Sequence, residues 1–403
     1  MTVATQPFRC YLFVFIGVFV FVVLAIVLLN GRLGERGLGS AAALRDASAW
    51  QQATRGVTYA PPITDARPFK VLRLADRLPE VNTLVLGSST VMGITANALP
   101  AERRLYNFSL TGNSTAAIVA EAEAAESVLR DKVQWLLVGL DWSVGQIYHG
   151  EAVASVDFSV DSALRSYALR DTPWFKRAED ALTWPRVVNL AKVMRAAFAS
   201  PAPLAALHRS LFDVAGEPYR CDDGEIARDY DTQNPGWCRG YRYDGSWTYA
   251  RDTRLTAAQA ATLALAAVAP SSKYAKSVCS AAGEPNAAYL RRLGEAAQRL
   301  AARGGGVLFL LPPLAPGMEQ AMLNSPRLKP CLERTKTALQ AWGALYQVSV
   351  IDAGASERFG CLPGEFSDEH HAYPECYARV LGRYFADAAG GRVAHGLYPA
   401  GAK

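Results

Sequence analysis

Residues 81–92 read V-N-T-L-V-L-G-S-S-T-V-M, and this stretch decides how the rest of the chain is interpreted. Its apolar part, residues 81–86, is typical of a short buried β-strand. The apolar run stops at Gly87, and Ser88 and Ser89 follow directly. A glycine turn with a serine at its tip, after a buried strand, is how α/β enzymes present a nucleophile. Gly-Ser-Ser also occurs in ordinary loops, where a serine caps the next helix, so a nucleophile needs a histidine and a carboxylate elsewhere.

The same kind of apolar run recurs along the chain and alternates with helical patterns. The further strands are expected at residues 105–108, 135–140, 307–311 and 348–351. The helices are expected at residues 115–130, 287–303, 331–346 and 377–388, the first of them capped by Ser114 or Thr115. This alternation predicts an α/β fold, a three-layer α/β/α sandwich with a five-stranded parallel sheet. A ligand site is then expected at the carboxyl ends of the strands, where Gly87 and Ser89 lie.

The alternation is interrupted in the middle of the chain, and this gives the predicted domain organisation. Residues 79–142 and 300–390 form the α/β domain, and residues 143–299 form a helical and aromatic-rich insertion. Residues 1–30 are expected to be a membrane anchor, residues 31–78 a stem, and residues 391–403 a tail.

A carboxylate and a histidine lie near the other end of the chain, in F-S-D-E-H-H-A-Y-P-E-C-Y-A. Asp368 and His371 are three residues apart before the last predicted helix. This spacing lets the carboxylate reach one ring nitrogen and leaves the other nitrogen for a hydroxyl nucleophile, which needs such a base near neutral pH. His370 is an alternative base, but it is only two residues from Asp368. A metal site that uses both histidines is not expected, because adjacent side chains seldom point the same way.

These two motifs resemble those of the SGNH (GDSL-like) hydrolases. The first block of that superfamily is Gly-Asp-Ser, which Gly87-Ser88-Ser89 matches with serine in place of aspartate, and its last block is Asp-x-x-His. The resemblance covers residues 79–142 and 300–390. It implies that Ser89 is the nucleophile, that His371 is the general base and acid, and that Asp368 orients His371.

The resemblance also implies an oxyanion hole, formed by the backbone N–H groups of Ser89 and of Gly112 in N-F-S-L-T-G-N-S. The third block of the family, Gly-x-Asn-Asp, normally supplies an asparagine to this hole. Here the chain reads G-L-D-W-S, so Asp141 or Ser143 takes the place of that asparagine. An ionised Asp141 is a poor donor to an oxyanion, and loss of one donor costs about 10²–10³ in rate.

Within the superfamily, the chain most resembles the membrane-anchored branch with alginate O-acetyltransferases and the D-alanylation protein of teichoic acids. This resemblance implies a serine-dependent O-acyltransferase or carbohydrate esterase that acts on a cell-surface or secreted polysaccharide, with acetyl as the expected acyl group. It also implies a membrane O-acyltransferase or a polysaccharide synthase as partner, and it implies no cofactor.

Residues 11–29 contain no charge and no proline. This run is long enough for one membrane-spanning helix. A cleavable signal peptide is the alternative, but its apolar core is usually shorter. Arg32, Arg36 and Arg45 follow this run, and by the positive-inside rule they mildly favour a cytoplasmic C-terminus.

The cysteines favour the opposite side. The chain has seven, of which all but Cys10 lie beyond the apolar run, an even number as a disulfide set requires. Disulfides persist in the periplasm or outside the cell. Proximity suggests the pairs Cys221–Cys238 and Cys361–Cys376. The predicted location is therefore the bacterial inner membrane, with the soluble domain in the periplasm.

The remaining composition excludes some classes of function. The net charge of +5 over 403 residues comes from scattered basic residues, which leave no nucleic-acid footprint. The aromatic segment from residue 219 to residue 249 suggests stacking on sugar rings through Trp237, Tyr241 and Trp247. The alternative is that these rings form the small core of a disulfide-pinned lobe.

Two functional hypotheses follow from the sequence. The first is the membrane-anchored acyltransferase or esterase with the triad Ser89, His371 and Asp368. The second is a non-catalytic SGNH-like assembly or binding protein in exopolysaccharide biosynthesis or export, which the altered third block favours and the intact Asp-x-x-His pair opposes.

Overall fold

The structure is a computed structural model of the 403-residue chain, and it describes residues 6–35, 41–58, 66–140, 158–160, 174–212, 216–229, 235–249, 253–272 and 285–399. Contacts divide the chain into two compact units. The N-terminal unit contains Met1–Thr64 and Asp161–Arg239, and the sheet unit contains Asp65–Val160 and Gly240–Lys403.

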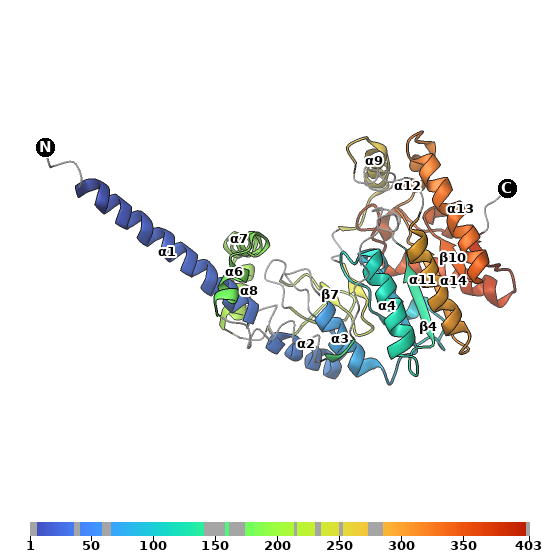
Figure 1. Cartoon of the computed structure of the whole chain (residues 1–403), viewed down its shortest axis with the longest axis horizontal. Helices are drawn as coiled ribbons and strands as arrows, with labels where there is room; N and C mark the ends of the chain where they lie inside the picture. Colours follow the sequence, from blue (N-terminus) through green and yellow to red (C-terminus); the bar gives the residue numbers. More distant parts are fainter. Residues whose placement is uncertain are drawn as a thin grey trace. The chain divides into compact units, whose positions relative to one another are not determined.

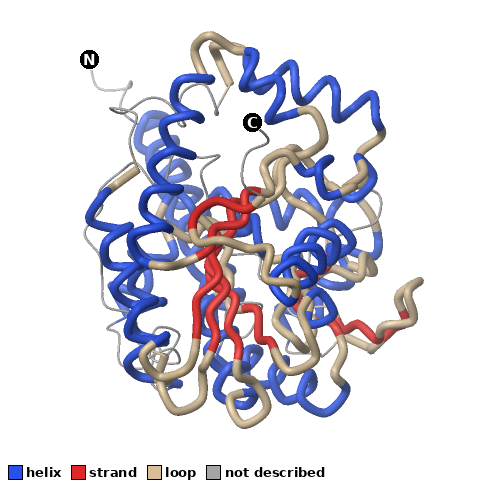
Figure 2. Tube along the Cα trace, turned by 90° about the vertical axis from the view of Figure 1, so that its right-hand side faces the viewer, coloured by secondary structure: helices blue, strands red, loops and turns tan. Residues whose placement is uncertain are grey.

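The sheet unit is built on a six-stranded sheet with the order β11-β10-β9-β4-β2-β3. Every neighbouring pair in it is parallel. The strands are β2 (Thr83–Leu86), β3 (Leu105–Asn107), β4 (Trp135–Gly139), β9 (Gly306–Leu311), β10 (Ser349–Asp352) and β11 (Gly396–Tyr398). Figure 2 shows these strands side by side between helices. All residues of β2 and β3 are buried, which fits the apolar run Leu-Val-Leu at residues 84–86 of β2.

The parallel α/β prediction is confirmed in this coarse form, but the predicted number of strands is wrong. The five expected strands are all present, and β11 is a sixth that lies in the segment predicted to be a tail. Its three residues, Gly-Leu-Tyr, are too short to show a strand pattern, and they become a strand only by pairing with β10.

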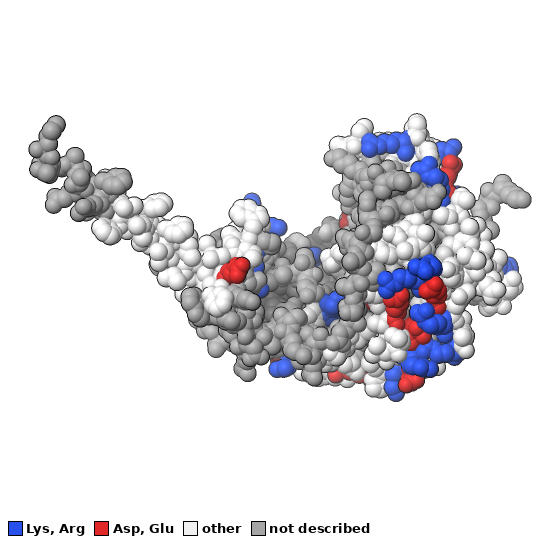
Figure 3. All heavy atoms as spheres, in the orientation of Figure 1, with Lys and Arg blue, Asp and Glu red and all other residues white. Residues whose placement is uncertain are grey.

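Helices α4 (Thr115–Val128), α11 (Ala287–Ala301) and α13 (Lys329–Tyr346) pack side by side along the sheet, as Figure 1 shows. The Trp342 indole joins α13 to α11 by donating to the Leu290 carbonyl oxygen at 2.7 Å. Ser114 caps α4, because its hydroxyl accepts from the Ala117 N–H. Figure 3 shows acidic and basic side chains interleaved over α4 and α11, and they include the ion pairs Arg292–Glu123 and Arg299–Glu126.

The other helices of the sheet unit are α3 (Arg67–Arg77), α9 (Ala257–Val268), α12 (Met318–Asn324) and α14 (Pro374–Ala389). Short 3₁₀ helices follow two of the strands: η1 (Ser89–Val91) and η2 (Ala96–Ala98) after β2, and η5 (Ser356–Phe359) and η6 (Pro363–Glu365) after β10. Helix α14 packs against η2, η5 and η6. A hairpin of β7 (Gly240–Tyr241) and β8 (Trp247–Thr248) completes the described elements of this unit.

The N-terminal unit is mostly helical. Its helices are α1 (Gln6–Glu35), α2 (Ala41–Thr54), α6 (Trp174–Ala181), α7 (Trp184–Ala199) and α8 (Pro201–Phe212). Its strands are β1 (Val57–Thr58), β5 (Tyr219–Arg220) and β6 (Ile226–Arg228). Within α1, Cys10–Gly31 is long and apolar enough to cross a membrane.

The units divide the chain differently from the predicted domains. Residues 161–239 of the expected insertion group with the N-terminal unit, whereas the part from Gly240 onward groups with the sheet. Helix α3, expected in the stem, groups with the sheet unit as well. The two disulfides suggested by proximity, Cys221–Cys238 and Cys361–Cys376, are both present.

Candidate active site

The turn after β2 presents Ser89 at the point where the strand order reverses. Strand β3 lies on one side of β2 and β4 on the other, which is where ligands bind in open α/β sheets. Gly87 has a φ of +154°, and a Cβ there would lie 2.5 Å from Val91 Cγ2, so only glycine fits. The buried Ser88 caps η1 by accepting from the Thr90 N–H at 3.3 Å, which leaves Ser89 half-buried at the start of η1.

His371 joins this turn to Asp368. Its Nε2 lies 2.8 Å from Ser89 Oγ, and its Nδ1 lies 2.6 Å from Asp368 Oδ2. The other carboxylate oxygen of Asp368 accepts the backbone N–H groups of His370 at 2.9 Å and of His371 at 3.0 Å. The loop thus wraps around the carboxylate. The three-residue spacing lets Asp368 reach both the ring and the backbone N–H of His371. The structure places all three predicted residues in one hydrogen-bonded chain.

The electrostatics of Asp368 suit this arrangement. Burial alone would raise the pKa of the Asp368 carboxyl, but the hydrogen bond and the electrostatic attraction of His371, with help from His370, outweigh it. The pKa of Asp368 therefore lies well below its ordinary value, and the group is an anion at neutral pH. An anion at Nδ1 holds the proton on that nitrogen, which leaves Nε2 free to accept the Ser89 proton.

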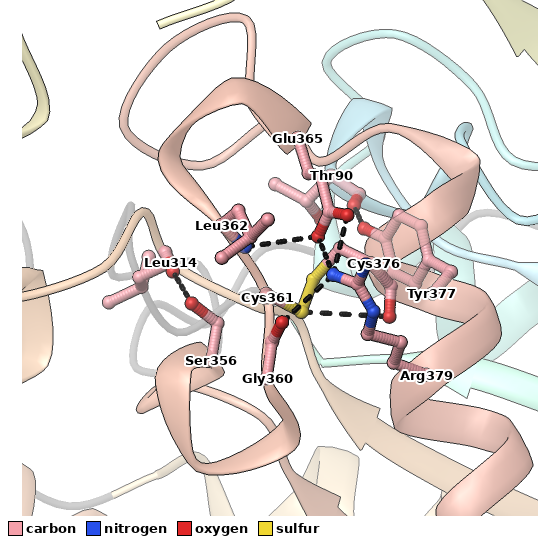
Figure 4. The surroundings of a disulfide bond; sticks show 10 residues. All are labelled: Thr90, Leu314, Ser356, Gly360, Cys361, Leu362, Glu365, Cys376, Tyr377 and Arg379. Carbon is pink, nitrogen blue, oxygen red and sulfur yellow. Dashed lines mark hydrogen bonds and ion pairs between the residues drawn. A yellow bond between two sulfur atoms is a disulfide. The ribbon is translucent and has the colours of Figure 1, made fainter. Parts of the chain in front are cut away.

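A disulfide and helix α14 hold the loop that carries Asp368 and His371; Figure 4 shows this disulfide, Cys361–Cys376, with Tyr377 beside it. Cys361 and Cys376 bracket this loop, and their Cα atoms are 5.0 Å apart. The next residue, Tyr377, is buried, and its hydroxyl donates to the carbonyl oxygen of Thr90, directly after Ser89. The same short segment of α14 is therefore bonded to the loop that carries His371 (residues 361–376, the base loop) and to the turn that carries Ser89 (residues 87–93, the serine turn).

The two loops also touch directly at Gly93. A Cβ at this position would lie 2.4 Å from the Ala372 carbonyl oxygen and 3.1 Å from the Tyr377 ring. Ala372 follows His371 in the chain, so the absence of a side chain at Gly93 sets the distance between the serine turn and the base.

Asn107, at the end of β3, supports the serine turn from the neighbouring strand. Its buried amide donates to the carbonyl oxygens of Val91 at 3.0 Å and Ile94 at 2.9 Å, and its oxygen accepts the Ser109 N–H. Sequence reasoning missed this residue, although a polar side chain at the carboxyl end of a buried strand is a usable signal.

Tyr249 is a second residue that sequence reasoning did not place in the site. Its hydroxyl donates to the Ser89 carbonyl oxygen at 3.2 Å, and its ring centroid lies 5.9 Å from that of His371. The ring also meets Tyr373 edge-on, with centroids 5.5 Å apart. The half-buried Tyr249 therefore lies beside the serine and the histidine together.

The predicted oxyanion donors, Ser89 and Gly112, both lie in turns. Among the described residues, neither of their backbone N–H groups donates to a protein acceptor. Both groups are therefore available to an oxygen of a ligand. The predicted third-block residues, Asp141 and Ser143, lie outside the described residues.

A second polar network supports the serine turn from α4. Asn113 donates to the Gly87 carbonyl oxygen at 3.2 Å and to both carboxylate oxygens of Glu121 at 3.1 and 2.9 Å. The Arg67 guanidinium lies 2.7 Å from Glu121. Complete burial raises the pKa of Glu121 to about 7, against the opposing effects of Arg67 and Asn113.

The predicted sugar-stacking residues do not form one surface. Tyr241 is 1% exposed and Trp247 is 8% exposed; their rings pack on each other and Tyr241 stacks on Phe69. Buried rings cannot stack on a sugar, so for these two residues the prediction is corrected to a packing role. Trp237 belongs to the N-terminal unit and is half-exposed. The boundary between the two units divides the aromatic segment of residues 219–249 at Arg239 and Gly240.

His370 as the base and a metal ion are the two alternatives to His371 as the base in this loop. The histidine bonded to Ser89 is His371, whereas the nearest carboxylate oxygen to the His370 ring nitrogen is that of Glu369, at 3.5 Å. Asp368, His370 and His371 have ligand atoms within 4.8 Å of one another. A cation bound through either ring nitrogen of His371 would break one of its two hydrogen bonds, to Asp368 or to Ser89.

Comparison of the chain with protein-family models, with curated proteins and with solved structures gives no match.

Proposed function

We propose that the chain is a membrane-anchored serine O-acyltransferase or acyl esterase with an SGNH-like three-layer α/β domain. The observation that carries this proposal is the hydrogen-bonded chain from Ser89 through His371 to Asp368 at the carboxyl end of β2. A nucleophile, a base and an orienting carboxylate in this order are what acyl transfer requires. A helix-capping role does not account for Ser89, because Ser88 provides the cap.

The proposed reaction has two acyl-transfer steps. The Ser89 hydroxyl attacks the carbonyl carbon of an acyl ester while His371 Nε2 takes its proton. The Ser89 and Gly112 N–H groups bind the oxyanion until the leaving alcohol departs with the proton from His371. A hydroxyl of the acceptor then gives its proton to His371 and attacks the acyl-serine, which releases the new ester and returns the proton to Ser89. A sugar hydroxyl as acceptor makes the protein a transferase, and water makes it an esterase.

The location and substrate class of the proposal have separate support. The Cys10–Gly31 stretch of α1 supports a membrane anchor, and two disulfides support an oxidising compartment such as the bacterial periplasm. The resemblance described above supports a polysaccharide as the substrate, acetyl as the acyl group, and a membrane O-acyltransferase or polysaccharide synthase as the partner.

The test uses the full chain in detergent with an activated acetyl ester and with an acetylated oligosaccharide. We expect Ser89→Ala and His371→Ala each to lose at least about 10³-fold in rate, and an acetyl adduct to form on Ser89 of the wild type. The matched control is His370→Ala, which removes the neighbouring histidine and leaves the bonds of His371 to Asp368 and Ser89 in place. Full activity in both Ser89→Ala and His371→Ala would show the mechanism to be wrong, whereas no activity in the wild type would favour the non-catalytic assembly role.

A further inference from the structure

Helix α1 has two different surroundings within the N-terminal unit. From Cys10 to Val22 every side chain is exposed, whereas most residues from Val23 to Gly31 are partly covered. Helices α6, α7 and α8 contact α1, and Figure 1 shows them at its C-terminal end. The buried Asn30 fixes this contact, because its amide donates to the Ala181 carbonyl oxygen at 2.7 Å.

The length of α1 sets the depth of these helices. The exposed part, residues 10–22, has 13 residues (22 − 10 + 1) and is about 20 Å long at about 1.5 Å per residue. A bilayer has a hydrocarbon core about 30 Å thick, so this part alone is too short to cross it. The apolar stretch of 22 residues, about 33 Å, is long enough. A spanning α1 therefore brings its covered end, and α6–α8 with it, to the level of one leaflet.

The outward face of α7 has the chemistry of a membrane interface. Trp184 and Phe198 are 77% and 74% exposed, and with Ala191 they recur every seven residues along one side of the helix. Lys192 and Arg195 are exposed next to this line. Tryptophan and other aromatic rings beside basic side chains are enriched where protein meets phospholipid headgroups.

The opposite side of α7 is apolar and packed. Leu190, Val193 and Ala197 are buried, so the helix already has a core-facing side. Its second, aromatic side needs another partner. A bilayer spanned by α1 would surround residues 10–22 with lipid next to α7, and its anionic headgroups would complement Lys192 and Arg195.

We infer that α7, together with α6 and α8, forms a collar around the end of α1 that lies in the headgroup layer of an anionic phospholipid bilayer. The collar binds lipid through Trp184, Phe198, Lys192 and Arg195. It attaches the N-terminal unit to the membrane surface, in addition to the attachment that the single span provides. The inference rests on α1 as a membrane anchor, and it is independent of the chemistry at Ser89.

The experiment measures the depth of a fluorescent label in vesicles that contain only this full-length chain and phosphatidylethanolamine with phosphatidylglycerol. Single cysteines at Phe198, Phe15 and Leu345 are introduced in a Cys10→Ser background, and labelling of that background alone is subtracted. Phe15 tests the anchor, and Leu345 on α13 is an apolar control with similar exposure to Phe198 (71% against 74%). Because all three side chains are exposed, the substitutions leave the packing intact, which circular dichroism checks.

We expect the label at Phe198→Cys to be quenched mainly by lipids that carry a nitroxide near the headgroup. The label at Phe15→Cys should be quenched mainly by lipids with a deep nitroxide, and the label at Leu345→Cys by neither. If the Phe15 label is not quenched, the anchor is wrong and the collar with it. If the Phe15 label is quenched but the Phe198 label is as exposed to water as the Leu345 label, the collar is wrong and the anchor stands. A Phe198 label that becomes shielded only after a second membrane protein is added would replace the lipid with a protein partner.

Discussion

Two carboxylates are linked to the serine turn through separate hydrogen-bond networks, and their surroundings shift their pKa values in opposite directions. Asp368 acts on Ser89 through His371, and Glu121 acts on Gly87 through Asn113. Hydrogen bonds from His371 and the backbone hold the pKa of Asp368 well below its ordinary value, despite burial. Complete burial raises the pKa of Glu121 to about 7, although Arg67 lies 2.7 Å away.

The difference separates the carboxylate that fits the proposed reaction from the carboxylate that supports the turn. Asp368 is half-buried and receives three hydrogen bonds, so it stays charged and can orient a base and stabilise an imidazolium. Glu121 has no contact with solvent, so its protonation is coupled to the folding of the chain. We therefore assign the Asp368 side to the reaction and the Glu121 side to support of the turn, and four variants test this division.

The largest effect is expected from Asp368→Asn. An amide at this position can donate to Nδ1 and so favours the proton on Nε2, where it prevents His371 from accepting the Ser89 proton. We expect kcat to fall about 10³–10⁴-fold with little change in melting temperature. The control is Glu369→Gln, whose carboxylate neighbours His370 and not His371. Equal losses in the two variants would contradict the role of Asp368.

The next effect is expected from Gly93→Ala, which tests the spacing of the two loops. The added Cβ would lie 2.4 Å from the Ala372 carbonyl oxygen, so the base loop must move away from Ser89. A shift of this kind costs up to about 10²-fold in kcat. Gly382→Ala on α14 is the control, because a Cβ there meets no atom within 4 Å. Unchanged kcat in Gly93→Ala would mean that activity does not depend on the close approach of the Ser89 turn and the His371 loop.

A smaller effect is expected from Tyr377→Phe. The change removes the donor to the Thr90 carbonyl oxygen and leaves the ring in place. We expect a loss of about 1–3 kcal/mol in stability and a decrease in kcat smaller than that of Gly93→Ala. Tyr398→Phe, which loses a hydroxyl bonded to Asp387 at 2.5 Å, is the comparison. The prediction is wrong if the two variants lower kcat equally.

The smallest effect on activity is expected from Glu121→Gln, which acts on the pH dependence of stability. Because the folded-state pKa is raised from 4.5 to about 7, the folded chain binds this proton more tightly than the unfolded chain. The contribution of Glu121 to stability is therefore greatest below pH 4.5 and decreases as the pH rises through 4.5 to about 7, by up to about 3 kcal/mol.

Glutamine cannot titrate, so this decrease should be absent in Glu121→Gln, as measured by melting temperature against pH in detergent. Glu123→Gln, whose carboxylate pairs with Arg292 on the helix surface, should keep the pH dependence of the wild type. If Glu121→Gln lowers kcat as strongly as Asp368→Asn, the division between the two sides fails.

Local sequence patterns determined the features that depend on neighbouring residues. Five strands were predictable because buried parallel strands are rich in apolar residues, as at residues 84–86. A cap at Ser114 or Thr115 was predictable, since a helix start needs a nearby acceptor, and the structure shows that Ser114 provides it. Asp368 and His371 were paired by their spacing within one loop, and both disulfides join cysteines less than 20 residues apart.

The tertiary structure alone decided the features that join distant segments. Nothing around Gly93 shows that Ala372 will approach it, and nothing in residues 396–398 shows a strand before β10 provides the partner. Tyr241 and Tyr249 belong to one aromatic segment, yet one is buried in packing and the other reaches Ser89. The physical reason is that a side chain's burial and partners depend on long-range packing, which sequence periodicity does not encode.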